Sequence, residues 1–247
     1  MTPDTTEADS ARVLVVGAAG GIGRACVDRL TAGRHRVVGA DRGSDGDLDV
    51  SDVDVTAPGG AEQAVAAAED RMGGLDGIVH AVGMSGRRLG DGPVTTCSDE
   101  AWDEVLRVNL GSAFRLLRAG LPALRRAGGG SVVLIGSVLA ETTDPDFLTA
   151  AYAASKGGMV SLARAAAREG SADGVRVNVV AAGLVHTPMA RRAAEDPDIQ
   201  GRLASLQPLA RGMLAPEDIA GAVAWLLSED AARVTGAVVP VDGGWLL

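Results

Sequence analysis

The chain has 247 residues, of which 47% are hydrophobic, 22% charged and only 2% aromatic, and its net charge is −9. This length allows one large α/β domain with a sizeable core, and the composition is ordinary for a globular protein. The acidic balance and the shortage of aromatic rings argue against a nucleic-acid partner or an anionic membrane surface, because both are held by clustered Lys and Arg, and single strands also by stacked rings.

The N-terminus and the cysteines indicate the cellular compartment in which we expect the chain. Residues 1–11 are polar and acidic, so we expect a disordered N-terminus before a single domain over residues 12–247. No apolar run approaches the ~20 residues that a membrane span needs. Cys26 and Cys97 stand alone, without metal-ligand spacing, and so few thiols fit a reducing compartment. We therefore expect a cytoplasmic protein without a metal site.

Short apolar runs alternate with Ala- and Leu-rich helical stretches along the chain. The strand-like runs are residues 12–16, 36–40, 77–82, 131–136, 175–180 and 237–241. The main helices are expected over residues 22–32, 99–126 (one or two helices), 152–169 and from residue 216 onward. Continuous apolar strands are buried on both faces, which predicts an α/β fold with a doubly wound parallel sheet of about seven strands and helices on both faces. Residues 141–149 and 187–212 are predicted to be long irregular insertions.

A glycine-rich turn separates the first strand from the first helix. Gly17, Gly21 and Gly23 have the spacing G-x-x-x-G-x-G, which lets the backbone turn tightly and lets a pyrophosphate approach the helix N-terminus. Asp41 ends the second strand, where an acid can accept hydrogen bonds from the adenosine ribose hydroxyls. Its carboxylate would repel a 2′-phosphate, so NAD(H) is favoured, while the adjacent Arg42 keeps NADP(H) possible. The domain is therefore predicted to be a Rossmann-type dinucleotide-binding domain.

The chain has one tyrosine, Tyr152, and one lysine, Lys156, four residues apart. On a helix these positions share a face, so a phenol and an ammonium can act on one bound molecule. Arg supplies the generic positive charge elsewhere, which indicates that Lys was kept where a compact ammonium is needed. Taken alone, the pattern also fits a surface pair.

Together with further motifs, these residues resemble the short-chain dehydrogenase/reductase family from Val13 to Gly244. The other motifs are Asp54-Val55, Val108-Asn109-Leu110, Ile135-Gly136-Ser137, Arg176-Val177-Asn178, Thr187-Pro188-Met189 and Val241-Asp242-Gly243-Gly244. The resemblance implies a catalytic tetrad of Asn109, Ser137, Tyr152 and Lys156. The cofactor contacts that it and the glycine turn imply are Gly17, Gly21, Ile22, Gly23, Asp41, Arg42, Asp54, Val55, Ala81, Val82, Gly83, Tyr152, Lys156, Gly183, Val185 and Thr187.

The tetrad has a physical logic of its own. To act as a general acid/base near neutrality, Tyr152 needs its pKa lowered by ~2 to 3 units from ~10, and Lys156 with the oxidised nicotinamide would supply the positive field. Ser137 would orient the substrate oxygen. Asn109 would hold a water that links Lys156 to solvent.

The chain departs from the family's pattern at three places. Val16 stands where Thr is usual, Ala182-Gly183 where Pro-Gly is usual, and the segment 80–83, His-Ala-Val-Gly, where Asn-Asn-Ala-Gly is usual. We expect Val16 and Ala81 to form a matched apolar contact. We expect His80, at the end of a buried strand, to be a hydrogen-bonded structural group rather than a second acid/base.

These features predict an oxidoreductase that transfers a hydride between NAD(H) and a secondary alcohol or ketone, with Tyr152 as general acid/base. One alternative is an NADPH-dependent 3-oxoacyl (carrier protein) or biosynthetic ketoreductase, for which Arg125-Arg126 is a candidate docking patch. Another is a non-catalytic dinucleotide-binding regulator, which would not need Ser137 and Tyr152 together. The substrate is a small molecule with candidate pocket walls at residues 84–89, 138–148 and 187–209, mostly apolar, and Arg87-Arg88 and Arg191-Arg192 are interpreted as solvated surface.

The helix over residues 157–167 is rich in Ala and Gly, which allows close packing against a second copy. Similar proteins are mostly tetramers or dimers, so we expect a homotetramer or homodimer. The apolar end, Trp245-Leu246-Leu247, is expected to be buried at a subunit contact.

Overall fold

The computed structural model describes residues 10–43 and 50–247. Most of the predicted disordered N-terminus, residues 1–9, lies outside the described residues. At its end, the Ser10 hydroxyl donates to the Arg34 carbonyl at 2.9 Å, and the Ala11 N–H donates to Nδ1 of His35 at 3.2 Å.

The described strands form one seven-stranded sheet in the order β3-β2-β1-β4-β5-β6-β7, and each pairing is parallel. The strands are β1 (Arg12–Val16), β2 (Arg36–Asp41), β3 (Val50–Asp52), β4 (Gly77–His80), β5 (Gly130–Ile135), β6 (Val175–Ala182) and β7 (Val238–Val241). The order reverses between β1 and β4, so the predicted doubly wound α/β fold is confirmed. Only β3 was missed, because three residues are too few to show a pattern.

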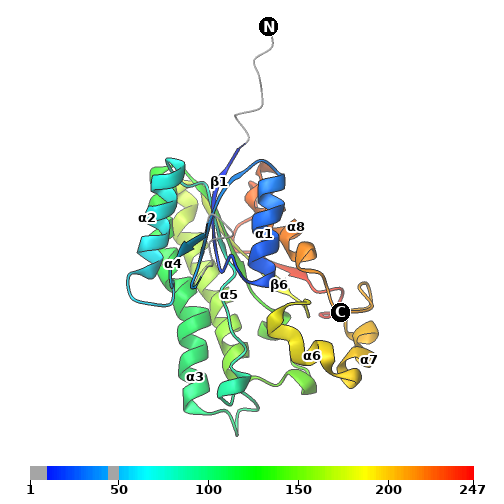
Figure 1. Cartoon of the computed structure of the whole chain (residues 1–247). Helices are drawn as coiled ribbons and strands as arrows, with labels where there is room; N and C mark the ends of the chain where they lie inside the picture. The colour runs from blue at the N-terminus through cyan, green and yellow to red at the C-terminus, as the bar shows by residue number, and fades with distance from the viewer. Residues whose placement is uncertain (1–9, 44–49) are drawn as a thin grey trace.

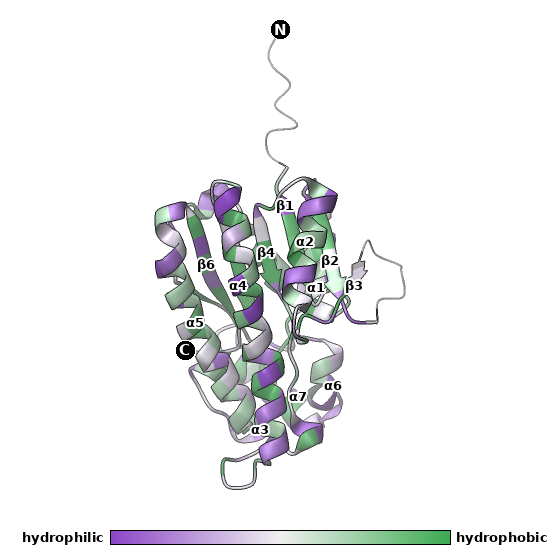
Figure 2. Cartoon of the chain, turned by 90° about the vertical axis from the view of Figure 1, so that its left-hand side faces the viewer, coloured by the Kyte–Doolittle hydropathy of each residue, from purple (hydrophilic) through white to green (hydrophobic). Residues whose placement is uncertain are grey.

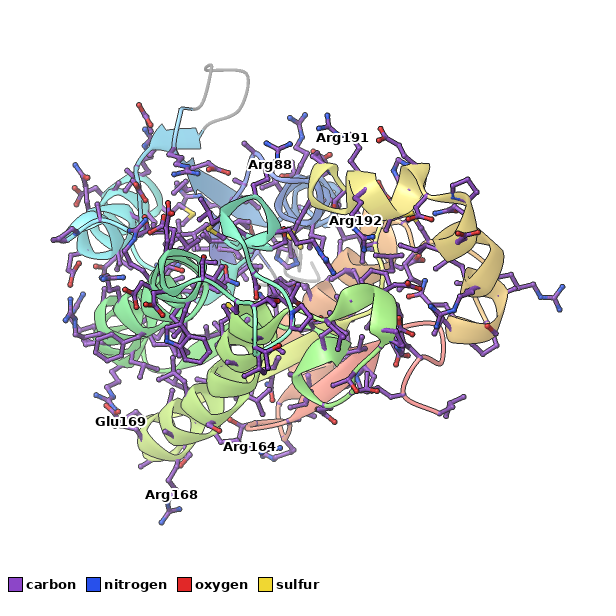
Figure 3. The ribbon with its side chains drawn as sticks, turned by 90° about the horizontal axis from the view of Figure 1, so that it is seen from below. Arg88, Arg164, Arg168, Glu169, Arg191 and Arg192 are labelled. Carbon is purple, nitrogen blue, oxygen red and sulfur yellow. The ribbon has the colours of Figure 1, made fainter. Side chains whose placement is uncertain are left out.

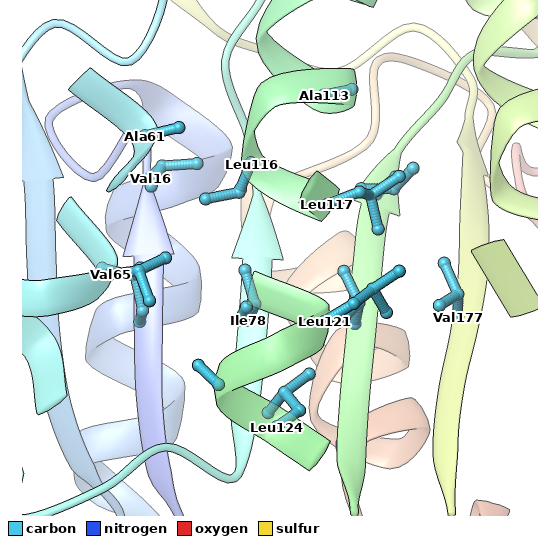
Figure 4. Close-up of a cluster of buried hydrophobic side chains, with 14 of the residues drawn as sticks. Val16, Ala61, Val65, Ile78, Ala113, Leu116, Leu117, Leu121, Leu124 and Val177 are labelled. Carbon is cyan, nitrogen blue, oxygen red and sulfur yellow. The ribbon is translucent and has the colours of Figure 1, made fainter. Parts of the chain in front are cut away.

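Helices cover both faces of the sheet (Figure 1). One face carries α2 (Gly60–Met72), α4 (Gly111–Arg126) and α5 (Ala150–Gly170), and the other carries α1 (Gly21–Ala32) and α8 (Pro216–Leu227). Figure 2 looks onto the first of these layers, with largely hydrophobic strands behind it. In its core, Leu116, Leu121 and Leu124 of α4 pack over Ile78 of β4 (Figure 4). The strands are apolar on both sides because both sides are covered.

The expected contact between Val16 and Ala81 is wrong. Val16 packs in the core beneath α2 and α4, whereas Ala81 packs against the core on the α1 and α8 face. Their connection is through the backbone, where the Ala81 N–H donates to the Val16 carbonyl at 2.9 Å. Successive residues of a strand point to opposite faces, and Ala81 follows the residue that pairs with Val16.

The helical region predicted over residues 99–126 is confirmed as two α-helices joined by a π-helical turn. α3 (Asp99–Val105) leads into the five-residue turn Leu106–Leu110, and α4 continues directly from it. Asn109 lies in this turn. A π-turn shifts the following side chains around the helix axis and is frequent at functional sites.

The irregular insertion predicted over residues 187–212 is largely helical, so that expectation was wrong. After a 3-10 turn (Pro188–Ala190) come α6 (Arg191–Glu195) and α7 (Pro197–Leu206). The Asp196 carboxylate accepts from the Asp198 and Ile199 N–H groups and caps α7, which begins with Pro197. The charged residues around this start obscured the helical pattern in the sequence.

The segment 141–149 is irregular apart from one 3-10 turn (Pro145–Phe147), as expected. The remaining 3-10 turns are Arg87–Leu89, Val138–Ala140, Ser171–Asp173 and Glu229–Ala231. No helix in residues 10–43 and 50–247 has the length and apolar character needed to cross a membrane.

Candidate active site

Two adjoining cavities of about 380 and 840 Å³ form a groove at the carboxyl ends of the strands. Both are lined by Gly20, Ala81, Val82 and Gly83, so the two spaces meet at the turns after β1 and β4. The strand order reverses here, which is where open α/β sheets bind ligands. The groove is therefore the candidate site.

The glycine turn leaves no room for side chains. Gly17 has a φ of +80°, and a Cβ on it would lie 2.7 Å from the Ala81 carbonyl carbon. A Cβ on Gly23 would collide with the Gly17 carbonyl. The backbone therefore folds back on itself and brings the N-terminus of α1 to the groove, where its free N–H groups favour an anion.

Asp41 anchors this turn at the far end of the larger cavity. Its Oδ2 accepts from the Ala19 N–H at 2.9 Å and its Oδ1 from the Arg42 N–H at 2.8 Å. Hydrogen bonds from Thr56 hold the pKa of the nearby Asp54 below its usual value. The charged residues lining this cavity are Asp41, Asp54, Glu100, Asp103 and Glu104 against Arg42, Arg88 and Arg107.

The structure brings nearly all of the sequence-predicted site residues to the groove. The larger cavity is lined by Gly17, Asp41, Arg42, Asp54, Val55, Ala81, Val82 and Gly83. The smaller is lined by Gly21, Ile22, Ala81, Val82, Gly83, Ser137, Tyr152, Lys156, Gly183, Val185 and Thr187. Gly23 and Asn109 line neither cavity and lie behind the walls. The Cys, His, Asp and Glu side chains of the described residues gather nowhere in a group of three that could hold a metal.

Tyr152 and Lys156 both face the smaller cavity from the first turns of α5. Lys156 is only 3% exposed, and its Nζ donates to the Ile135 carbonyl at the end of β5 at 2.7 Å. The same Nζ lies 5.7 Å from the centroid of the Tyr152 ring. Burial lowers the pKa of Lys156 to about 8, because the charged form loses hydration.

The lowering expected for the Tyr152 pKa depends on a bound oxidised nicotinamide, and the chain's own groups together act in the opposite direction. Burial raises the pKa of the phenol, and a hydrogen bond with Ser137 opposes this shift only in part. Ser137 follows β5, and its hydroxyl accepts from the Leu139 N–H at 3.2 Å. Tyr152 is thus a neutral phenol, able to donate a proton.

Asn109 is fully buried and braces the segment after β4. Its Oδ1 accepts from the Met84 N–H at 2.8 Å, and its Nδ2 donates to the Met84 carbonyl and to the Ser155 hydroxyl, both at 3.0 Å. Ser155 in turn donates to the Tyr152 carbonyl at 2.7 Å. Asn109 therefore connects the segment after β4 to the first turns of α5, and both of its amide hydrogens are used within the protein.

His80 is fully buried on β4 and lines neither cavity. Its Nε2 lies 2.8 Å from the Ser112 hydroxyl, which donates to the Val108 carbonyl at 2.5 Å, so Nε2 is the donor to Ser112. Burial and the charge of Lys156 lower the pKa of His80 to about 3, which keeps it neutral. This geometry fits the structural interpretation, with His80 holding the π-turn that carries Asn109.

Three residues of the site were missed in the sequence. The Asp91 carboxylate is 5% exposed and accepts from the N–H groups of Ala151 and Tyr152, both at 3.0 Å, so it caps the start of α5. Gln207 is fully buried and accepts from the Leu184 N–H at 2.7 Å. Trp245 lines the smaller cavity. Of the three, only Trp245 could have been suspected from the sequence, because it is a rare residue directly after the Asp-Gly-Gly motif.

The substrate side of the smaller cavity is apolar with a charged margin. Phe147 and Trp245 meet edge to face with ring centroids 5.4 Å apart. The C-terminus was expected to pack against another subunit, but Trp245 packs within its own chain. Leu139 and Met189 extend this wall. Arg87 and Arg192 also line the cavity. Arg87 is partly buried, which corrects its interpretation as solvated surface, whereas Arg192 is exposed, as expected.

Comparison with known proteins places nearly the whole chain among reductases and dehydrogenases. A family model described as enoyl-(acyl carrier protein) reductase matches residues 17–246. The 3-oxoacyl-[acyl-carrier-protein] reductase MabA of Mycobacterium tuberculosis is 37% identical over 95% of this chain and 92% of its own length. A short-chain type dehydrogenase/reductase from Mycobacterium ulcerans superposes with a TM-score of 0.87 and 31% identity, covering 95% of this chain and 89% of the other. Aldohexose dehydrogenase of Thermoplasma acidophilum superposes with a TM-score of 0.85 and 27% identity, covering 96% and 94%.

Proposed function

The chain belongs to the short-chain dehydrogenase/reductase family of oxidoreductases, and from that premise we propose that it transfers a hydride between NAD(H) and a secondary alcohol or ketone, with Tyr152 as general acid/base. One observation carries the proposal. Ser137, Tyr152 and the buried Lys156 line the same small cavity, which adjoins the larger cavity beside the glycine turn.

The residues of the groove fit a nicotinamide dinucleotide. The glycine turn leaves space at the α1 N-terminus for a pyrophosphate, because side chains on Gly17 or Gly23 would collide with the neighbouring backbone. Asp41 lies at the adenosine end and Lys156 at the other. When bound, the cofactor supplies or accepts the hydride at nicotinamide C4.

The protein's own groups handle the proton. In the reductive direction the Tyr152 phenol donates its proton to the carbonyl oxygen and becomes a phenolate, and the hydroxyl of Ser137 donates a hydrogen bond to the same oxygen. The Lys156 ammonium stabilises the phenolate through its charge, which acts strongly where little water is present. The raised pKa of Tyr152 in the free protein leaves the phenol protonated and ready for reduction. Asn109 and Asp91 are positioning residues in this proposal, since they hold the segments that present Tyr152.

The charge of the larger cavity supports NAD(H). Asp41, Asp54, Glu100, Asp103 and Glu104 outnumber the arginines that line it, and Arg42 lies in the field of Asp54 and Glu104. A 2′-phosphate would therefore meet net repulsion. We expect wild type to prefer NADH over NADPH and Asp41→Ser to reduce or reverse that preference in kcat/KM. An equal preference in both proteins would contradict the assignment.

A second candidate is reduction of 3-oxoacyl groups on a carrier protein, favoured by the similarity to MabA over nearly the whole chain. The docking patch expected for it, Arg125-Arg126, is already ion-paired. Arg125 contacts Glu169 at 3.0 Å and Asp173 at 2.7 Å, and Arg126 contacts Glu69 at 2.9 Å. A free ketone is therefore the first choice, and a carrier-linked one the second.

Cofactor oxidation tests the proposal. NADH and NADPH consumption is followed for wild type and Tyr152→Phe against free, acidic and thioester-linked ketones. We expect turnover with NADH and a loss of ~10²- to 10⁴-fold in kcat for the variant, with NADH affinity unchanged. A variant as active as wild type would refute the role of Tyr152, and a protein that binds NADH without turning over any ketone would favour the regulator.

We also propose that the chain assembles as a homotetramer or homodimer. Trp102 of α3 and Phe114 of α4 remain 44% and 49% exposed, which is apolar area that association would bury. Light scattering is expected to give the mass of a multimer, and a monomer at micromolar concentration would contradict the proposal.

A further inference from the structure

Two arginines from distant segments converge on one carbonyl at the entrance of the smaller cavity. Arg87 lies in the turn after β4 and Arg192 in α6. Their Nη2 atoms donate to the Asp146 carbonyl oxygen, at 2.9 Å and 2.8 Å. Because both nitrogens surround the same oxygen, one carboxylate or phosphate group could accept from both side chains.

Neighbouring carboxylates balance the positive charge of this pair only in part. The nearest carboxylates of the loop, Asp144 and Asp146, are both ion-paired with Arg202 of α7. Arg87 has no ion pair among the residues that the structure describes, and Arg192 approaches only Asp196, at 3.8 Å. Burial and the charge of Arg192 lower the pKa of Arg87, although the charges of Asp91 and Asp146 act in the opposite direction.

The charged residues that line the smaller cavity are Arg87, Lys156 and Arg192, and no Asp or Glu of the described residues lines it. This is unusual in a chain with a net charge of −9. The two arginines lie beside the apolar wall, where the Arg192 guanidinium stands 5.7 Å from the centroid of the Phe147 ring. The cavity thus combines Tyr152, which is the proposed proton donor, with an apolar wall and a positively charged margin.

We propose that the substrate is a ketone or alcohol that carries an anionic group, and that Arg87 and Arg192 bind this group while its apolar part lies against Phe147, Leu139 and Met189. The inference rests on the proposed function and adds the class of substrate. The anion is either a carboxylate of the substrate itself or a phosphate on an attached arm, because the same guanidinium pair recognises both.

Neighbouring arginines provide matched controls. Figure 3 shows Arg191 near Arg192, at the opposite side of the view from Arg164 and Arg168 of α5. Arg191 and Arg164 are exposed and line neither cavity. Their substitution by Gln removes the same charge from the protein without touching the proposed site.

The test compares matched charged and neutral ketones. A 3-oxo acid is compared with its methyl ester, and a 3-oxoacyl thioester of phosphopantetheine with that of unphosphorylated pantetheine. For at least one charged member we expect Arg87→Gln and Arg192→Gln each to raise KM about tenfold, as for a lost charge-assisted hydrogen bond. The neutral member should be unaffected, as should both members with Arg191→Gln and Arg164→Gln. The pair that responds identifies the source of the anion.

Three outcomes would overturn the inference. Equal losses on charged and neutral ketones would mean that the arginines only hold the loop at Asp146. No loss on either would mean that they contact no substrate. A higher Kd for NADH in Arg87→Gln would indicate that the Arg87 guanidinium binds the cofactor phosphates and not the substrate. Thermal melting checks that each variant folds, and Arg87→Lys, which keeps the charge on a flexible chain, should recover part of the lost affinity.

The failure of the proposed function is distinguishable from the failure of this inference. If wild type turns over the neutral ester and Tyr152→Phe does not, the oxidoreductase role stands whatever the arginine variants show. If no ketone is turned over, calorimetric titration of the NADH-bound protein with the acid and the ester still decides the inference. Tighter binding of the acid, lost in Arg87→Gln, supports it, and equal binding contradicts it.

Discussion

The two cavities of the groove differ in what forms their walls and in the charge of those walls. The larger cavity lies against strand ends, the glycine turn and α3, and carboxylates predominate among its charged residues. The smaller combines the proposed catalytic side chains, Ser137 after β5 and Tyr152 and Lys156 of α5, with side chains from the turn after β4, the 141–149 loop, α6 and the C-terminus, and its charged residues are all cationic. The proposed dinucleotide end is thus shaped largely by backbone close to the first helix, whereas the proposed substrate end is assembled by long-range side-chain contacts.

The difference between the two walls predicts where substitutions should have large effects and where they should have small ones. Where backbone touches backbone, a single added methyl group has no space and the neighbouring chain cannot yield. Where side chains meet at an exposed margin, a substitution removes one contact among several and leaves the fold intact. The predictions below test this contrast.

The largest effect is expected for Gly23→Ala. The added methyl would collide with the Gly17 carbonyl, so the turn must open and NADH affinity should fall by more than about 100-fold, with a loss of ~1 to 3 kcal/mol in the free energy of unfolding. The control is Gly221→Ala in α8, where a Cβ meets nothing within 4 Å. This change should be neutral or stabilise by up to ~1 kcal/mol. Fluorescence titration with NADH and urea unfolding measure both. Normal NADH binding by Gly23→Ala would show that the turn can accommodate a side chain at this position.

Asp91→Ala should have the next largest effect. It removes the carboxylate that caps the first turn of α5 at Ala151 and Tyr152, so we expect a loss of ~1 to 2 kcal/mol in unfolding free energy and a lower kcat. The lower kcat follows because the backbone of Tyr152 loses its anchor. Asp230→Ala, at an exposed turn, is the control. A stability loss with unchanged kcat would restrict Asp91 to a structural role.

A pH dependence is expected from His80. Its pKa is about 3 in the folded protein against 6.5 for an ordinary histidine, so the unfolded chain binds the proton more tightly. Neutral His80 contributes fully above about pH 6.5, and its contribution is lost progressively as the pH falls toward 3. His80→Asn keeps an N–H donor for Ser112 but does not titrate. The difference in unfolding free energy between wild type and this variant should shrink or reverse between pH 7 and pH 4, and a constant difference would contradict the assignment.

The smallest effect is expected at the margin of the substrate cavity. Arg202 is 41% exposed and pairs with Asp144 and Asp146, so Arg202→Gln should lower thermal stability less than Asp91→Ala does. KM for the ketone should rise a few-fold at unchanged kcat, because the loop that carries Phe147 is less firmly held. Steady-state kinetics beside Arg164→Gln measures this. A fall in kcat comparable to that of Asp91→Ala would contradict the expectation that substitutions at the exposed margin have small effects.

The same contrast explains what the sequence revealed. Gly17, Gly23 and Asp41 form a local motif around one turn, and the spacing of Tyr152 and Lys156 follows from a single helix, so these positions could be predicted. Arg87, Arg192 and Trp245 come from segments far apart in the chain, and no periodicity shows that they meet. Asp91 and Gln207 were missed for a related reason. Each satisfies backbone N–H groups of another segment, a need that appears only in the folded chain.

Some errors had local causes. Residues 187–212 were expected to be irregular because short helices with many charges show little periodicity, although Asp196-Pro197 is a helix start signal. The lowered pKa expected for Tyr152 is a different matter and stays a prediction, because it depends on an oxidised nicotinamide beside Lys156. Within the chain, desolvation raises this pKa.

Isotope transfer from the cofactor tests the central claim most directly. NADH carrying two deuterium atoms at C4 is mixed with a ketone and wild type in a single turnover, and the alcohol is analysed by mass spectrometry, with Tyr152→Phe in parallel. The account predicts one deuterium on the carbinol carbon with wild type and almost none with the variant over the same time. Alcohol without deuterium, or equal labelling by the two proteins, would contradict hydride transfer supported by Tyr152.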